Sequence, residues 1–118
     1  MKKLVVFFIC LLFVGCSKNL ESGKITCSQK NSLLNSSKAV LIDVRTESEY
    51  LEGHLDNSIN IPYDSIVSDV KSKNISINDF IIVYCKSGGR SSKAFDALIN
   101  AGYKNVYDLG SINNCKEE

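Results

Sequence analysis

Two apolar runs, within residues 39–44 and 80–84, constrain the fold of this chain more than any other feature of its sequence. A strand that is apolar almost throughout is typical of a parallel sheet that is covered on both faces. Each run is followed by a segment whose apolar residues recur with helical spacing. The alternation of buried strands with helices therefore predicts an α/β fold, in which a small, mostly parallel sheet is flanked by helices on both faces.

Local signals divide the rest of the chain into further strands and helices. Besides the two apolar runs, short strands are expected at residues 25–26, 59–61 and 105–108. Helices are expected at residues 28–35, capped by Ser28, at 47–51, at 64–73, and from Ser91 or Ser92 to Gly102. Thr46 and Glu49, three residues apart, match a capping box at the start of the second helix.

The first sixteen residues have the pattern of an export signal. Lys2 and Lys3 precede eleven consecutive apolar residues, 4–14. At ~1.5 Å per residue these eleven are too few for a helix that crosses a hydrocarbon core of about 30 Å. They fit the apolar region of a secretory signal peptide, and Gly15 and Cys16 then mark a cleavage site. An ordinary signal peptide and a short uncleaved anchor are the alternatives to the lipoprotein signal considered next.

Residues 13–16 resemble the lipobox of bacterial lipoproteins. The resemblance implies that residues 1–15 are a signal peptide cleaved before Cys16, and that the thiol of Cys16 receives a diacylglycerol. Residues 16–24 are polar and lack periodicity, so they would form a lipidated tether, with residues 25–118 as the folded domain. The expected location is the bacterial cell envelope, where the lipid anchors the protein to a membrane and the domain faces the periplasm or the exterior.

Length and charge limit the size and the partners of the protein. The chain has 118 residues, which is enough for one domain, and we expect a monomer. Its 14 basic and 13 acidic residues give a net charge of +1, so nothing electrostatic predicts nucleic acid as a partner. With one histidine and scattered cysteines, no metal site is expected. The sequence leaves open whether Cys27 and Cys115 form a disulfide.

Residues 84–92 combine several features that stabilise a thiolate. Cys85 leaves the second apolar strand, and a helix is expected to begin a few residues later. Gly88 and Gly89 permit backbone conformations closed to other residues, so that successive N–H groups converge. The nearby basic residues are Lys86, Arg90 and Lys93. Helix N-termini and cations lower the pKa of a cysteine from ~8.5 to about 3.5–7.5, so we interpret Cys85 as a reactive thiol rather than an inert buried one.

Residues 85–90 look like the active-site loop of the rhodanese-like sulfurtransferases. Other motifs of that family stand in the same order along this chain, at residues 41–45, 49–55, 60–62 and 101–106. The resemblance implies the rhodanese-like fold and an enzyme of the thiosulfate sulfurtransferase type that needs no cofactor. A small anionic donor such as thiosulfate would pass a sulfane sulfur to Cys85. The resulting persulfide would pass the sulfur to a thiol or a cyanide-like acceptor.

The same resemblance implies roles for individual residues. Cys85 is the nucleophile, and the backbone N–H groups of residues 86–90 form a cradle around its sulfur. The substrate-binding residues are Lys86, Ser87, Gly88, Gly89 and Arg90. Lys86 and Arg90 orient the anionic donor. Asp43 and Arg45, at the end of the first apolar strand, either support the loop or form a solvated ion pair.

Loop length separates sulfur transfer from phosphate chemistry. Protein tyrosine phosphatases and the related cell-cycle phosphatases place five residues between cysteine and arginine, whereas this loop has four. The tighter ring favours a single extra sulfur, so a phosphatase or an arsenate reductase is disfavoured. A sulfur-binding or redox-sensing module with little turnover remains the alternative. His54 is interpreted as a structural residue in a turn, because sulfur transfer from thiosulfate requires no proton transfer.

Overall fold

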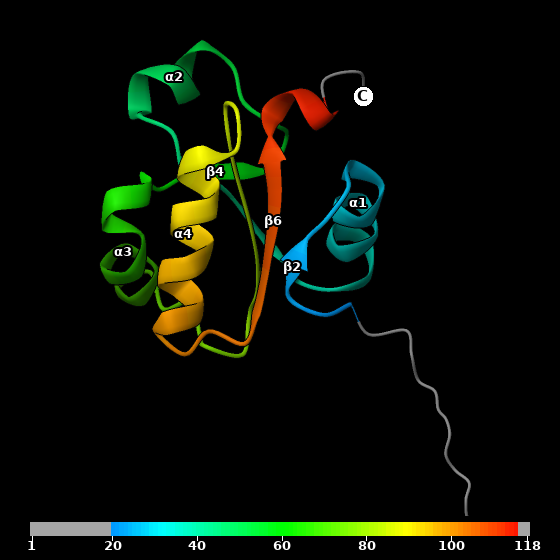
Figure 1. The fold of residues 1–118 in the computed structure, drawn as a ribbon, viewed down its shortest axis with the longest axis vertical. Helices are drawn as coiled ribbons and strands as arrows, with labels where there is room; N and C mark the ends of the chain where they lie inside the picture. The colour runs from blue at the N-terminus through cyan, green and yellow to red at the C-terminus, as the bar shows by residue number, and fades with distance from the viewer. Residues whose placement is uncertain (1–19, 116–118) are drawn as a thin grey trace, which may run out of the picture.

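The computed structural model describes residues 20–115, which form a five-stranded sheet with helices on both faces (Figure 1). The strands are β2 (Gly23–Lys24), β3 (Val40–Asp43), β4 (Ser58–Asn60), β5 (Phe80–Cys85) and β6 (Asn105–Ser111). The helices are α1 (Cys27–Ser36), α2 (Glu47–Glu52), α3 (Ile66–Ser72) and α4 (Gly89–Asn100), with 3₁₀ turns η2 (Tyr63–Ser65) and η3 (Ile112–Cys115). The strand order is β2-β6-β5-β3-β4, and every pairing is parallel. The predicted α/β architecture is confirmed.

The central strand, β5, is buried on both of its faces. Ile81, Ile82 and Val83 have no solvent exposure, which explains why the sequence is apolar throughout this segment. Since all the strands run in parallel, the carboxyl ends of β3, β5 and β6 meet at one edge of the sheet. In Figure 1 this edge carries α2, the loop between β5 and α4, and η3.

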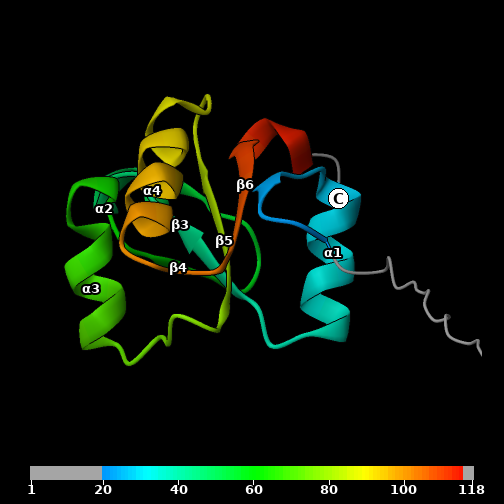
Figure 2. The same ribbon diagram turned by 60° about the horizontal axis from the view of Figure 1, so that its bottom comes forward.

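Alternate strand residues point into two hydrophobic cores, one on each face of the sheet. The core beneath α3 and α4 includes Val83, Cys85 and Leu98. The core beneath α1 and η3 includes Ile82 and Tyr84. Figure 2 shows α3 and α4 on one side of the sheet and α1 on the other. The side chains of Tyr84 and Cys85 therefore point to opposite faces at the end of β5.

The folded part begins earlier than the sequence predicts. The first strand is Gly23–Lys24 and not residues 25–26, because the backbone leaves the sheet to begin α1. Just before this strand, the hydroxyl of Tyr107 donates to the carbonyl oxygen of Leu20 at 2.8 Å. The sequence assigns residues 16–24 to a tether, whereas the structure joins the last five residues of that segment to the folded body.

Two helix caps also differ from the predicted ones. Thr26, not Ser28, caps α1, since its side chain accepts a hydrogen bond from the backbone N–H of Gln29, the third residue of the helix, and completes a capping box. Gly88 is the N-cap of α4, where Ser91 or Ser92 is predicted. The helix therefore begins closer to the end of β5 than the sequence indicates, and this shortens the loop that contains the candidate nucleophile.

A disulfide joins the two ends of the described chain. Cys27 at the start of α1 is bonded to Cys115 in η3, with their Cα atoms 5.4 Å apart. This settles the pairing that the sequence leaves open. The predicted signal peptide, residues 1–15, and the predicted lipidation site Cys16 lie outside the described residues. Within residues 20–115, none of the helices combines the length and the apolar character that a membrane span requires.

Candidate active site

Cys85 is the last residue of β5, and its sulfur lies against the first turn of α4. The residue is 1% exposed and is not part of a disulfide. Its Sγ atom accepts hydrogen bonds from the backbone N–H groups of Gly88, at 3.0 Å, and Ser91, at 3.3 Å. These donors form a cradle of the predicted kind. One of them, Ser91, lies beyond the predicted residues 86–90, because the first helical turn curls back over the sulfur.

Two opposing effects set the acidity of Cys85. Burial raises the pKa of the thiol, because a buried thiolate loses its hydration. Hydrogen bonds from the backbone and side chain of Ser91, and from the backbone of Gly88 and Ser87, lower the pKa by stabilising the thiolate. The hydrogen bonds prevail, so the pKa of Cys85 lies below its ordinary value. Such a thiol is a better nucleophile at neutral pH than a free cysteine.

Only one of the two loop glycines adopts a backbone conformation that requires glycine. Gly88 has a φ of 107°, where an L side chain is strained, and this turn directs its N–H toward the sulfur of Cys85. Gly89 has no positive φ and is the first residue of α4. The expectation that both glycines adopt special conformations is therefore wrong for Gly89.

Arg90 is held by a carboxylate on α2. Its Nη1 lies 2.7 Å from Oε1 of Glu49, and its Nη2 lies 3.1 Å from Oε2. Glu49 also accepts from the backbone N–H of Thr46 in the predicted capping box, which is confirmed. The hydrogen bond from Arg90, followed by that from the backbone of Thr46, lowers the pKa of Glu49 to about 2. The ionised Glu49 thus links α2 to the loop of the candidate nucleophile.

From its sequence context, Glu49 is predicted to be a capping residue and part of the 49–55 motif, and its bond to Arg90 is not predicted. The two residues are 41 positions apart, and local patterns carry no signal for a pair so distant. Arg90 is predicted to orient an anionic donor. In the structure its guanidinium is already paired with Glu49, and the hydrogen bond between them is the main reason that the pKa of Arg90 is raised. The negative charge of Cys85 raises the pKa of Arg90 further, so Arg90 is within electrostatic reach of the sulfur.

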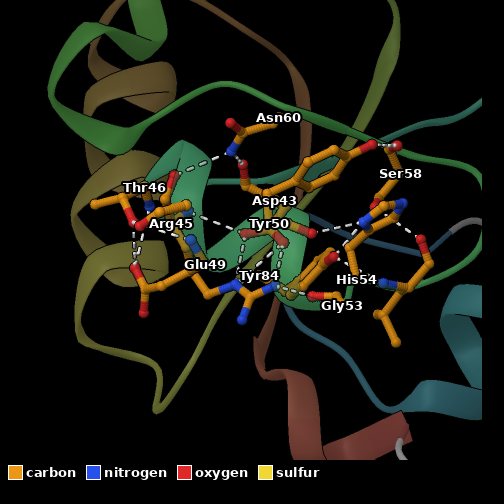
Figure 3. Close-up of polar contacts among 12 residues, drawn as sticks. Asp43, Arg45, Thr46, Glu49, Tyr50, Gly53, His54, Ser58, Asn60 and Tyr84 are labelled. Atoms are coloured by element: carbon orange, nitrogen blue, oxygen red, sulfur yellow. Dashed lines mark hydrogen bonds and ion pairs between the residues drawn. The ribbon is translucent and has the colours of Figure 1, made fainter.

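Asp43 and Arg45 form a buried ion pair at the carboxyl end of β3 (Figure 3). Nη2 of Arg45 lies 2.7 Å from Oδ2 of Asp43, and the two side chains are 8% and 0% exposed, so the pair is not solvated. The same Nη2 donates to the carbonyl oxygen of Gly53 at 2.7 Å, and the guanidinium carbon lies 6.0 Å from the centre of the Tyr84 ring. The pair thereby joins the turn after α2 to the residue that precedes Cys85.

The hydroxyl of Tyr84 holds the same turn after α2 through hydrogen bonds (Figure 3). Its hydroxyl accepts from the N–H of Leu55 at 3.0 Å and lies 3.1 Å from the hydroxyl of Ser58. Burial raises the pKa of Tyr84 to about 12, so the hydroxyl stays protonated at neutral pH. The turn between α2 and β4 is therefore held rigidly beside the end of β5.

The two lysines near the loop face different surroundings. Lys86 is exposed and lines an open pocket of about 550 Å³, and its carbonyl oxygen accepts from the hydroxyl of Ser111 at 2.6 Å. Nζ of Lys93 lies 5.8 Å from the centre of the Tyr63 ring. Of the three basic residues predicted near Cys85, Lys86 is therefore the one whose charge, within residues 20–115, is neither paired with a carboxylate nor placed over an aromatic ring. In the described part of the chain, no three His, Cys, Asp or Glu side chains are grouped as metal ligands.

Comparison with known proteins assigns this fold and loop to a family. The family model described as a rhodanese-like domain matches residues 26–118. This chain belongs to the rhodanese-like domain family. Among relatives of this rhodanese-like chain, thiosulfate sulfurtransferase 18 of Arabidopsis thaliana is 36% identical over an alignment of 106 residues that covers 80% of this chain and 77% of the relative. The tRNA uridine(34) hydroxylase of Buchnera aphidicola is 37% identical over 90 residues, but those residues span only 28% of its length and 72% of this chain.

Solved structures of rhodanese domains share the architecture. A rhodanese from E. coli, solved with anions, superposes with a TM-score of 0.61 at 30% identity, covering 64% of this chain and 89% of the rhodanese. A human single-domain sulfurtransferase superposes with a TM-score of 0.69 at 20% identity, and the match covers 85% of this chain and 98% of the human chain. The predicted rhodanese-like fold is confirmed. The relatives include sulfurtransferases and a hydroxylase, so the reaction has to be argued from the site.

Proposed function

We propose that this rhodanese-like domain is a sulfurtransferase of the thiosulfate sulfurtransferase type. It carries a sulfane sulfur on Cys85 from a small anionic donor such as thiosulfate to a thiophilic acceptor. The observation that carries the proposal is the position of the Cys85 sulfur, which lies where the amides of Gly88 and Ser91 converge. These amides stabilise a negative charge on sulfur, and both the thiolate and the persulfide that follows from it carry such a charge.

Loading of the enzyme moves no proton. The Cys85 thiolate attacks the outer sulfur of thiosulfate, and a new S–S bond forms. The bond between the two sulfur atoms of thiosulfate breaks, and sulfite leaves with its electron pair. Lys86, exposed beside the nucleophile, attracts the dianionic donor. The terminal sulfur of the persulfide is anionic, so the amide donors that hold the thiolate suit it as well.

The length of the loop and the relatives support sulfur transfer over the other chemistries. Four residues separate Cys85 from Arg90, and the amides converge on one sulfur atom rather than around a tetrahedral group. Relatives with this domain include thiosulfate sulfurtransferases that match most of their length. A module that binds sulfur with little turnover is the second candidate, and the 1% exposure of Cys85 favours it.

The decisive experiment is the release of thiocyanate from thiosulfate and cyanide by the purified domain. Cys85→Ala should abolish the release, while Ser92→Ala, an exposed neighbour on α4, should retain it as a matched control. Equal activity of the wild type and Cys85→Ala would reject the proposal. Mass spectrometry after incubation with thiosulfate separates the second candidate, which would gain one sulfur atom on Cys85 without repeated turnover.

We also propose that the mature protein is anchored in the bacterial cell envelope by a lipid on Cys16. The disulfide between Cys27 and Cys115 supports this location, because disulfides persist in oxidising compartments and are rare in the cytosol. Cells fed an alkyne fatty acid should label the wild-type chain but not Cys16→Ala. Equal labelling of both chains would contradict the proposal.

A further inference from the structure

An open pocket of about 550 Å³ adjoins the loop of the nucleophile. One wall is the turn after α2, another is η3, and Lys86 contributes from the loop itself. Lys86 directly follows Cys85, and Glu49, which also lines the pocket, holds Arg90 at the start of α4. Through Lys86 the pocket borders the loop, and Cys85 itself is not among its lining residues. Its lining combines the apolar side chains of Leu55 and Ile112 with charged ones.

His54 lines this pocket, and one of its two ring nitrogens is held in place. Nδ1 lies 2.8 Å from the carbonyl oxygen of Tyr50. A carbonyl oxygen only accepts, so Nδ1 carries a proton, and Nε2 of the neutral ring then has a free lone pair. The ring is stacked on that of Tyr50, with centroids 3.8 Å apart and planes 7° apart, which fixes its orientation (Figure 3). Among residues 20–115, no hydrogen-bond partner of Nε2 is found.

A proton enters the reaction when the acceptor is a thiol. An ordinary thiol has a pKa near ~8.5, so most of it is protonated at neutral pH and must lose a proton before it can attack. Histidine is the side chain that most readily exchanges protons near neutral pH. The bond from His54 to the Tyr50 carbonyl oxygen is the kind of structural role that the sequence predicts for this residue. Because that bond uses Nδ1, the other ring nitrogen, Nε2, can still accept a proton.

We propose that this pocket binds a small thiol as the sulfur acceptor, and that Nε2 of His54 takes the proton of that thiol. The inference rests on the proposed sulfur transfer through Cys85. As the proton passes to Nε2, the acceptor sulfur attacks the outer sulfur of the persulfide. The S–S bond of the persulfide breaks, and its electron pair returns to Cys85 as a thiolate. The product is a persulfide of the acceptor, and the imidazolium of His54 releases its proton to water.

The charges around the pocket fit this role. Arg45 and Glu49 line it, but each is paired, with Asp43 and Arg90 respectively. The remaining charged side chains of the lining are the exposed carboxylates Glu52 and Asp56 and the exposed ammonium of Lys86. Lys86, next to Cys85, favours the thiolate that attacks.

The test compares two acceptors on one variant. His54→Asn keeps an N–H for the Tyr50 carbonyl but has no base. Persulfide discharge at neutral pH should fall about 100-fold with 2-mercaptoethanol, which is mostly protonated, since general bases contribute roughly 10²–10⁴-fold. Thionitrobenzoate is already ionised, so discharge by it should change little. The loss with 2-mercaptoethanol should shrink as the pH rises and that thiol ionises. Asp96→Asn, exposed on α4 outside the pocket, serves as the control.

An equal loss with both thiols, or no loss with either, would overturn the role of His54. If His54→Asn does not fold, His54→Gln is put through the same comparison. Loading is measured separately, as the gain of one sulfur atom on wild-type Cys85 after incubation with thiosulfate. A wild-type domain that never loads would overturn the proposed function itself. A domain that loads, with a variant that discharges to both thiols at the wild-type rate, would overturn only this inference.

Discussion

Removal of the Cys27–Cys115 disulfide should greatly reduce the stability of the domain. The bond joins α1 to η3 across a sequence separation of 88 residues, so it closes almost the whole described chain into one loop. In the unfolded chain, a cross-link of this length removes entropy worth about 4.5 kcal/mol at room temperature by the loop-closure relation. A domain of this size has an unfolding entropy of roughly 0.2 kcal/mol per degree, so the melting temperature should fall by about 20 °C.

The assay is thermal unfolding followed by circular dichroism, with and without reductant, in a Cys85→Ala background that removes the free thiol of residues 20–115. The oxidised protein should melt about 20 °C above the reduced protein and above the double variant Cys27→Ser/Cys115→Ser. Reductant should leave the melting temperature of the double variant unchanged, which is the control. If mass spectrometry shows the disulfide, but reductant shifts the melting temperature by only a few degrees, the loop-closure reasoning is refuted.

Two further predictions concern the loop and its ion pair. Gly88→Ala should slow alkylation of Cys85 at neutral pH about tenfold. An alanine at this positive φ is strained by about 1–2 kcal/mol, and relief of the strain moves the N–H of residue 88 away from the sulfur, so the thiolate is less stabilised. Gly89→Ala, whose φ is ordinary, is the matched control, and equal losses in both variants would contradict the argument. Glu49→Gln should lower the free energy of unfolding by about 1 kcal/mol at neutral pH. Since the pKa of Glu49 falls from 4.5 to about 2 on folding, this contribution is present above pH 4.5 and is lost as the pH falls from 4.5 to 2. Urea unfolding of the wild type and this variant at several pH values measures the gap, and a gap that stays constant down to pH 2 would count against the ion pair.

The position of Cys85 at the end of a buried strand was predictable from the sequence because its signals are local. An apolar strand, a cysteine and a glycine turn lie within ten residues, and the backbone of parallel α/β sheets places such a turn at the carboxyl edge. The start of the helix was less predictable. Gly88 can adopt the left-handed conformation at no cost, so α4 begins there and not at a serine. That shift of the N-cap by three or four residues is what makes the amide of Ser91 a donor to Cys85.

Long-range partners could not be read from the sequence. The capping box of Glu49 was evident from its spacing to Thr46, but its bond to Arg90 depends on how α2 packs beside α4. The disulfide depends in the same way on the position of η3 next to α1. Short strand β2 was misplaced because two residues carry too weak a periodic signal, and its pairing with β6 decides its position.

The pairing of Arg90 with Glu49 limits the free positive charge beside Cys85. A guanidinium whose charge is balanced by a carboxylate 2.7 Å away attracts an incoming anion less than a free one does. Lys86 then supplies the exposed positive charge, while the amides of Gly88 and Ser91 stabilise the sulfur through dipoles without net charge. In the proposed reaction the donor thiosulfate and the product sulfite are both anions, so a site with several free cations would hold the product as firmly as the donor and would slow its release. If the proposed sulfur transfer is correct, a paired arginine beside directed amides therefore favours the reacting sulfur over the departing sulfite.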